Sequence, residues 1–146
     1  MIRFLDWLTI ISLCYNSLMN KKELIKRCLF DEDAIETYPF NESKYGKMPV
    51  IRHKSNNKWF ALIFKLQNTL YVNLKAEPTT ISVLQDQYPE AITPAWHMNK
   101  VHWCKIDVNK IKPDILDAII KRSFSVTATK AKTKRKQHFT IPSQML

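Results

Sequence analysis

A single glycine, Gly46, occurs in this chain of 146 residues, and its scarcity limits the sites that the chain can build. Phosphate-binding loops, dinucleotide-binding turns and the nucleophile elbow each need several glycines, because the backbone there must approach a ligand closely or turn sharply. The sequence therefore excludes these three kinds of site. It also excludes collagen and flexible linkers rich in glycine and serine.

The length and composition are those of one soluble globular domain. Hydrophobic residues make up 45% of the chain, which is enough apolar material to bury a core without disulfide bonds. The three cysteines, Cys14, Cys28 and Cys104, lie far apart and form no CxxC motif. We therefore expect no disulfide framework and a location in the reducing cytoplasm.

The formal net charge is +10, and the excess is greatest at the C-terminal end. Residues 127–146 contain no acidic residue, and their low complexity predicts a disordered tail. The basic residues of this tail are Lys130, Lys132, Lys134, Arg135 and Lys136. A positive balance favours polyanionic partners, and these five cations predict weak, sequence-independent attraction to phosphates.

The N-terminal residues 1–18 are apolar but interrupted by Asp6, and they are too short to span a bilayer. They also make a poor signal peptide, because no small-residue cleavage site follows them. We hypothesise that Met19 is the functional start and that 1–18 is an upstream extension, with a helix packed on the domain or a crude membrane anchor as the alternatives. The predicted domain then spans 19–126, and the tail 127–146 follows it.

The pattern of apolar residues predicts a sheet with helices packed on it. The expected elements are a helix at 20–30, a long connection at 31–47, strands at 48–53, 58–64 and 70–75, a helix from Pro78 to Pro89, a loop or short strand at 93–100, a strand at 101–108 and a helix beginning at Pro113. Their order is α-β-β-β-α-β-β-α. Strands joined by short turns form an antiparallel sheet, so we predict an α+β two-layer sandwich.

Two of these strands carry most of the fold prediction. The strand at 58–64 is apolar on both faces, which indicates a central position, and we expect most of its aromatic residues to pack in the core rather than to stack on bases. In the strand at 70–75, Leu70, Val72 and Leu74 alternate with polar side chains, which predicts one buried face and one wet face.

Several motifs occur together in the order of a known family. They are Thr37-Tyr38-Pro39-Phe40, Lys58-Trp59-Phe60-Ala61-Leu62, Val72-Asn73-Leu74-Lys75, Tyr88-Pro89, Trp96-His97-Met98-Asn99-Lys100-Val101-His102-Trp103 and Arg122-Ser123-Phe124. In these motifs the chain resembles the MmcQ/YjbR-like family of small bacterial proteins over about residues 20–126. The resemblance implies a frataxin-like or secretion-chaperone-like α+β fold, which agrees with the predicted element order. It also implies DNA binding through a double-wing surface, without enzymatic activity.

The segment 97–103 and the neighbouring strand 70–75 concentrate polar side chains that suit anion binding. The candidate residues are Asn73, Lys75, His97, Asn99, Lys100, His102 and Trp103. Lysine supplies charge, asparagine supplies donors and tryptophan offers a stacking face. The structural alternative is that Trp103 belongs to the core while the two histidines tie a loop to the sheet.

His97, His102 and Cys104 have the side chains of zinc ligands, but their spacing matches no known zinc finger and no fourth ligand is evident. His102 and Cys104 are also unsuited to act as base and nucleophile, because side chains two apart on one strand face stand parallel. We therefore predict no metal, no cofactor and no catalytic residue, and a buried Cys104.

Together these observations predict a small, non-enzymatic, cytoplasmic protein without membrane attachment, which binds DNA through a basic polar face and a basic tail. One alternative is a protein-interaction or chaperone-like module, in which an exposed sheet face receives a peptide or a second copy of the chain. A second alternative is a small-ligand or metal site at His97–Trp103.

Overall fold

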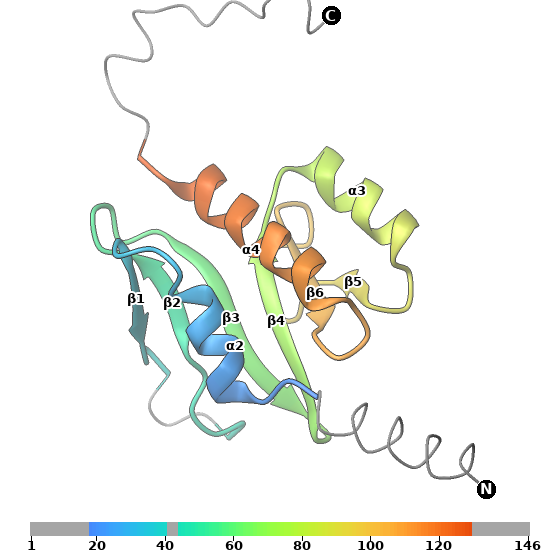
Figure 1. Cartoon of the computed structure of the whole chain (residues 1–146), viewed down its shortest axis with the longest axis horizontal. Helices are drawn as coiled ribbons and strands as arrows, with labels where there is room; N and C mark the ends of the chain where they lie inside the picture. The colour runs from blue at the N-terminus through green and yellow to red at the C-terminus, as the bar shows by residue number, and fades with distance from the viewer. Residues whose placement is uncertain (1–17, 41–43, 130–146) are drawn as a thin grey trace, which may run out of the picture.

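The computed structural model describes residues 18–40 and 44–129. They form one six-stranded antiparallel sheet and three helices, in the strand order β1-β2-β3-β4-β6-β5 (Figure 1). The strands are β1 (Ala34–Thr37), β2 (Val50–His53), β3 (Trp59–Leu66), β4 (Thr69–Lys75), β5 (Ile92–Pro94) and β6 (Trp103–Asp107). The helices are α2 (Lys21–Cys28), α3 (Pro78–Gln87) and α4 (Pro113–Thr127). The predicted α+β fold is confirmed.

The segment expected to be a long connection contains a strand. Residues of β1 pair with β2 from Ala34 opposite His53 to Thr37 opposite Val50, so four strands precede α3 instead of the expected three. The strand is short and lies at an edge of the sheet, where only one neighbour supports it. Its sequence pattern is correspondingly weak, because pairing with β2 rather than intrinsic propensity determines its conformation.

The helices cover one face of the sheet (Figure 1). Each begins with a recognisable signal: the side chain of Asn20 accepts a hydrogen bond from the Glu23 amide at the start of α2, while Pro78 and Pro113 open α3 and α4. Beneath the helices lies the main core, to which α2 contributes Leu24 and α4 contributes Ile120. A large apolar core of this kind supplies most of the stability of the fold.

None of the three described helices lies on the opposite face of the sheet, which we call the helix-free face, and its centre is covered by two loops. A second, smaller cluster forms there, in which Leu62 and Phe64 of β3 contact Met48 from one loop and Trp96 from the other. The strand β3 therefore buries side chains on both faces, as its apolar sequence predicts, and it is third of six in the sheet. The ends of this helix-free face remain outside the cluster.

Candidate functional site

Cationic and aromatic side chains alternate across one end of the helix-free face. Arg52 on β2 is paired with Trp59 on β3, and Lys75 on β4 is paired with Trp103 on β6. Residues two apart on a strand share a face, and the neighbours Leu74 and Cys104 belong to the helix-side core. The order across four adjacent strands is therefore arginine, tryptophan, lysine, tryptophan. We call these four residues the cation–aromatic row.

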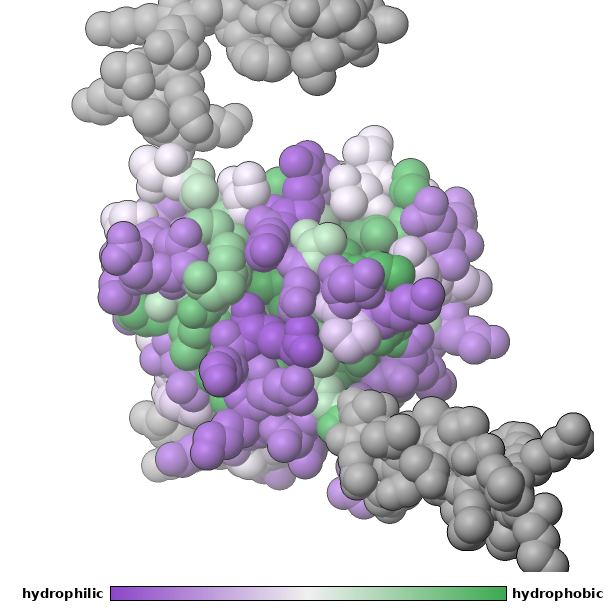
Figure 2. All heavy atoms as spheres, in the orientation of Figure 1, coloured by the Kyte–Doolittle hydropathy of each residue, from purple (hydrophilic) through white to green (hydrophobic). Residues whose placement is uncertain are grey.

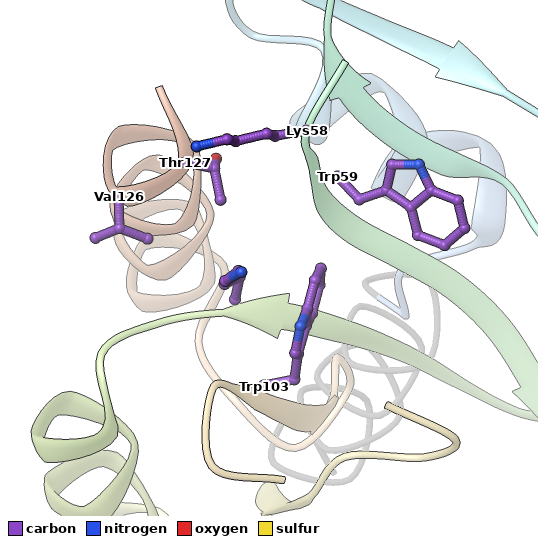
Figure 3. A pocket seen from close by; sticks show the side chains of 6 residues that line it. Lys58, Trp59, Trp103, Val126 and Thr127 are labelled. Carbon is purple, nitrogen blue, oxygen red and sulfur yellow. The ribbon is translucent and has the colours of Figure 1, made fainter. Parts of the chain in front are cut away.

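A hollow of about 360 Å³ opens beside this row. It is lined by Lys58, Trp59, Lys75, Trp103, Val126 and Thr127. Figure 3 shows Lys58 extending from the start of β3 toward Thr127 in the last turn of α4, with Trp103 on the β6 side of the opening. No acidic side chain lines the hollow among residues 18–40 and 44–129. The lining is therefore suited to an anion that also has a flat apolar part.

The hollow exists because β3 and β4 separate at this end. Their ladder ends at the pair Ala61 and Leu74. One residue further, the Lys75 amide donates to Oγ of Ser123 at 2.9 Å, and that hydroxyl donates to the Phe60 carbonyl at 2.6 Å. A side chain of α4 thus replaces the missing strand-to-strand hydrogen bond, which holds the two strand ends apart while satisfying both buried backbone groups.

The two lysines that line the hollow have no acidic partner among the described residues. Neither Lys58 nor Lys75 forms an ion pair in the described part of the chain, and Nζ of Lys75 lies 5.8 Å from the ring centroid of Trp103. Nε of Arg52 is buried with no hydrogen-bond partner among the described residues. Arg52 does not line the hollow and its Nε is closed to solvent, so Lys58 and Lys75 are the described cations that face a ligand there.

Of the seven folded-domain residues in the predicted site, the structure brings Lys75 and Trp103 together in the hollow. Asn73 lies elsewhere: it is fully buried, and its amide donates to the Trp96 carbonyl at 2.7 Å and accepts from the Trp96 amide at 3.3 Å. The sequence predicts a solvent-exposed face of β4 at Asn73. That prediction is wrong for this residue, because the loop that contains Trp96 covers it.

The other four predicted residues belong to the loop between β5 and β6. His97 is exposed with φ of 53°, and its ring lies 4.4 Å from that of Trp96, beside an apolar pocket of about 250 Å³. The side chain of Asn99 accepts hydrogen bonds from the amides of Val101 and His102, which is local turn chemistry. Lys100 and His102 are exposed, and neither lines the hollow.

The predicted basic tail from Lys130 to Lys136 and the extension 1–17 lie outside the described residues. Within the residues that are described, no group of three or more histidine, cysteine or acidic side chains could hold a metal ion. Cys104 is fully buried on the helix side of β6, and burial raises the pKa of its thiol to about 12. Cys104 packs as a core residue, whereas His102 is exposed in the loop before β6.

Sequence reasoning missed Lys58, Trp59 and Thr127 as parts of this site. Lys58 and Trp59 were interpreted as the beginning of a buried strand, although Trp59 is only half-buried, with its ring edge-on to that of Phe40 at 5.8 Å. The signal that could have identified Trp59 is its place at the first position of β3, directly after a turn, where a side chain is less covered than in the middle of the sheet. Thr127 gives no such signal, since only the docking of α4 places it there.

A polar chain beneath the hollow joins Asp33, His53 and Thr127. Nδ1 of the fully buried His53 lies 3.0 Å from Oδ2 of Asp33, and Nε2 lies 2.8 Å from Oγ1 of Thr127. The order carboxylate, imidazole, hydroxyl is that of a hydrolase triad. However, Nε2 also lies 3.0 Å from the Phe124 carbonyl, and the Thr127 hydroxyl donates to the Ser123 carbonyl at 2.8 Å. Both ring nitrogens thus face acceptors, which suits a clamp between β2 and α4 rather than a general base.

The helix side of the molecule has a different surface. Figure 2 shows hydrophobic area between α3 and α4, where an apolar groove of about 440 Å³ is lined by Leu84, Ile115 and Ile119. Arg122, which also lines the groove, forms an ion pair with Glu77. None of the described helices is long and apolar enough to cross a membrane.

Comparisons with known proteins agree with this fold. The family model described as YjbR matches residues 32–126. The protein YyaQ of Bacillus subtilis is 28% identical over 121 residues, which cover 75% of this chain and 99% of YyaQ. The protein YjbR of Escherichia coli K12 is 25% identical over 96 residues, which cover 66% of this chain and 75% of that protein.

Solved structures have the same fold. The crystal structure of Deinococcus radiodurans protein DR2400, a DUF419 domain, superimposes with a TM-score of 0.65 at 25% identity, covering 80% of this chain and 85% of that one. A structure from Pseudomonas syringae gives 0.62 at 24% identity, covering 75% and 100%.

Proposed function

This chain belongs to the YjbR family, and from that premise we propose that it is a non-catalytic protein that binds nucleic acid at the cation–aromatic row and the hollow beside it. The observation that carries the proposal is the composition of the hollow: two lysines and two tryptophans line it, and no acid does among the described residues. Cations pair with phosphates, and indole rings stack on bases. The basic tail predicted from sequence adds attraction that is independent of base sequence.

The proposed site differs in part from the binding face predicted from the sequence. Lys75 and Trp103 remain in it, while Lys58 and Trp59 replace the loop residues at 97–102. A non-catalytic role is supported by the polar chain at His53, whose ring nitrogens both face acceptors. The reducing cytoplasm is the proposed location, since Cys28 and Cys104 are free, buried thiols.

The test compares two double variants of the full chain that lose equal charge. Lys58→Gln with Lys75→Gln removes both lysines of the hollow, while Lys22→Gln with Lys26→Gln removes two exposed lysines of α2, on the helix side. Binding of a fluorescent oligonucleotide is measured at several salt concentrations. The first variant is expected to lower the salt slope by about 1.5 and to weaken binding about tenfold or more at low salt, because each phosphate contact contributes about 0.7 to 0.9 to the slope.

The control variant is expected to change affinity less than about threefold, because long-range attraction between exposed charges is screened. Equal losses in the two variants would mean that net charge alone drives binding, and the proposed site would be wrong. Undetectable binding by the unmodified chain at low salt would reject nucleic-acid binding altogether.

A protein-interaction module is the second candidate, and the apolar groove between α3 and α4 favours it. The sheet face expected to receive a peptide is covered at its centre by Met48 and Trp96, so the groove offers the larger apolar opening. Substituting Ile115→Asp and comparing the sedimentation of the chain alone would test self-association through this groove. A monomer in both cases would reject a second copy as the occupant.

A further inference from the structure

We infer that the nucleic acid recognised at the hollow is single-stranded, with an unpaired base stacked on Trp59 and its phosphates held by Lys58 and Lys75. This inference rests on the proposed function and names its substrate class. Three observations carry it: the spacing of the row, the unequal exposure of its two tryptophans, and the recessed position of the hollow.

The spacing of the row fits an extended strand. Trp59 on β3 and Trp103 on β6 are separated by the intervening strand β4, which carries Lys75. Two regular strand spacings of about 4.8 Å would put their backbones about 10 Å apart, and the separation is larger here because β3 and β4 part beyond the pair Ala61 and Leu74. Bases stacked within a duplex follow one another every 3.4 Å or so along each strand. A base at Trp59 is therefore too far from Trp103 to have its stacked neighbour there, which fits a strand whose bases are separated, and a single strand adopts this form without breaking base pairs.

The two tryptophans differ in what they offer. Trp103 is 7% exposed, so it forms a wall of the hollow rather than a platform. Trp59 is half-buried and meets Phe40 edge-on, with an angle of 86° between the rings. Figure 3 shows the Trp59 indole on the opposite side of β3 from α4, at the helix-free face. Trp59 is therefore the ring on which a base can stack.

The recessed position of the hollow argues against a duplex. Reading the major groove requires a helix or a two-stranded ribbon that projects from the protein. Here the cations and aromatic rings lie at the end of a sheet, and the hollow holds about 360 Å³. Base faces inside a duplex are covered by their neighbours, so the Trp59 ring has a partner only when a base is unpaired.

The experiment measures binding of the full chain to a labelled single strand of about 12 thymidines and to a duplex of the same length. The variants are Trp59→Leu, which keeps apolar bulk but removes the ring, and Trp59→Phe, which keeps a smaller ring. Stacking on one base is worth a factor of about five or more in affinity. We therefore expect Trp59→Leu to weaken single-strand binding at least about fivefold, Trp59→Phe to weaken it about twofold, and neither to alter duplex binding.

Raised salt separates this effect from the basic tail, because the electrostatic contribution falls with salt while stacking persists. The wild-type preference for the single strand is thus expected to grow as salt is added. Circular dichroism of each variant establishes that it is folded, and Trp59→Phe supplies a second test if Trp59→Leu does not fold. A threefold or greater preference for the duplex, or equal single-strand affinities for wild type and a folded ring-less variant, would overturn the inference.

These failures can be told apart from failure of the proposed function. If Lys58→Gln with Lys75→Gln weakens binding to both nucleic acids while the Trp59 variants do not, the site at the hollow stands and the single-strand inference is wrong. If the lysine variant behaves like its α2 control, the proposed function itself is wrong and the inference falls with it.

Discussion

Asp33 places its carboxylate 3.0 Å from Nδ1 of His53, a side chain with no exposed surface. The same carboxylate accepts two hydrogen bonds from Ser55, and these bonds, followed by the contact with His53, hold the pKa of Asp33 below its ordinary value of 3.8. The turn after α2 is thereby joined to β2, and through His53 to the end of α4.

This pairing predicts how stability depends on pH. Because the pKa of Asp33 is lower in the folded chain than in the unfolded one, its stabilising contribution is complete well above pH 3.8 and is lost as the pH falls through its native pKa. Asp33→Asn is therefore expected to lower the urea midpoint at pH 7, and the difference from wild type should shrink as the pH falls below 3.8 and the carboxyl group becomes protonated in both states. Asp86→Asn, at an exposed position of α3, is the control and should parallel wild type. A constant difference between Asp33→Asn and wild type across this range would contradict the assignment.

Ser123 gives a second prediction, for stability alone. Its hydroxyl bridges the Lys75 amide and the Phe60 carbonyl, and all of its surface is buried. Ser123→Ala leaves a buried donor and a buried acceptor without partners, which should cost about 1 to 3 kcal/mol of unfolding free energy. Ser125→Ala, exposed on the same helix, should change it by less than about 0.5 kcal/mol. Urea unfolding measures both, and equal small effects would mean that the bridge contributes nothing.

The main elements could be predicted because their apolar patterns are strong. The strand at 58–64 is apolar on both faces, and the structure places it third in the sheet with side chains in both clusters. The beginnings of the three helices could also be predicted, because Asn20 is a good N-cap residue and because Pro78 and Pro113 are favoured in the first turn of a helix. The strand β1 was not predictable, since four residues beside an acidic run carry too short a pattern.

The candidate site was less predictable than the fold, because the side chains that meet in the hollow come from distant parts of the chain. Lys75 and Trp103 could be nominated from sequence, yet Thr127 reaches them only through the docking of α4. Asn73 has the residue type expected of a ligand-binding group, but the loop that covers it is set by tertiary packing, and no local pattern shows this.

Asn73 gives a prediction that separates a structural role from direct binding. Its two hydrogen bonds to the backbone of Trp96 fix the covering loop on the helix-free face. Asn73→Ala should cost about 1 to 3 kcal/mol of unfolding free energy, while the folded variant binds the single-stranded oligonucleotide within about twofold of wild type. Asn99→Ala, which loses hydrogen bonds only in an exposed turn, should lower the unfolding free energy by less than about 1 kcal/mol and leave the affinity nearly unchanged. A large loss of affinity in folded Asn73→Ala would place Asn73 in the binding site after all.

The hairpin between β3 and β4 offers a stabilising change. Leu66 is paired with Thr69, and the two residues between them, Gln67 and Asn68, both have positive φ, at 50° and 67°. This is the geometry of a type I′ turn, in which Asn-Gly is the preferred pair because glycine adopts positive φ without steric cost. Gln67→Asn with Asn68→Gly should therefore raise the free energy of unfolding by about 1 kcal/mol and the melting temperature by about 4 °C. Asn68→Ala should have the opposite effect of similar size, because alanine is strained in this conformation. Calorimetry of the two variants tests the turn assignment, and a change of the same sign in both would contradict it.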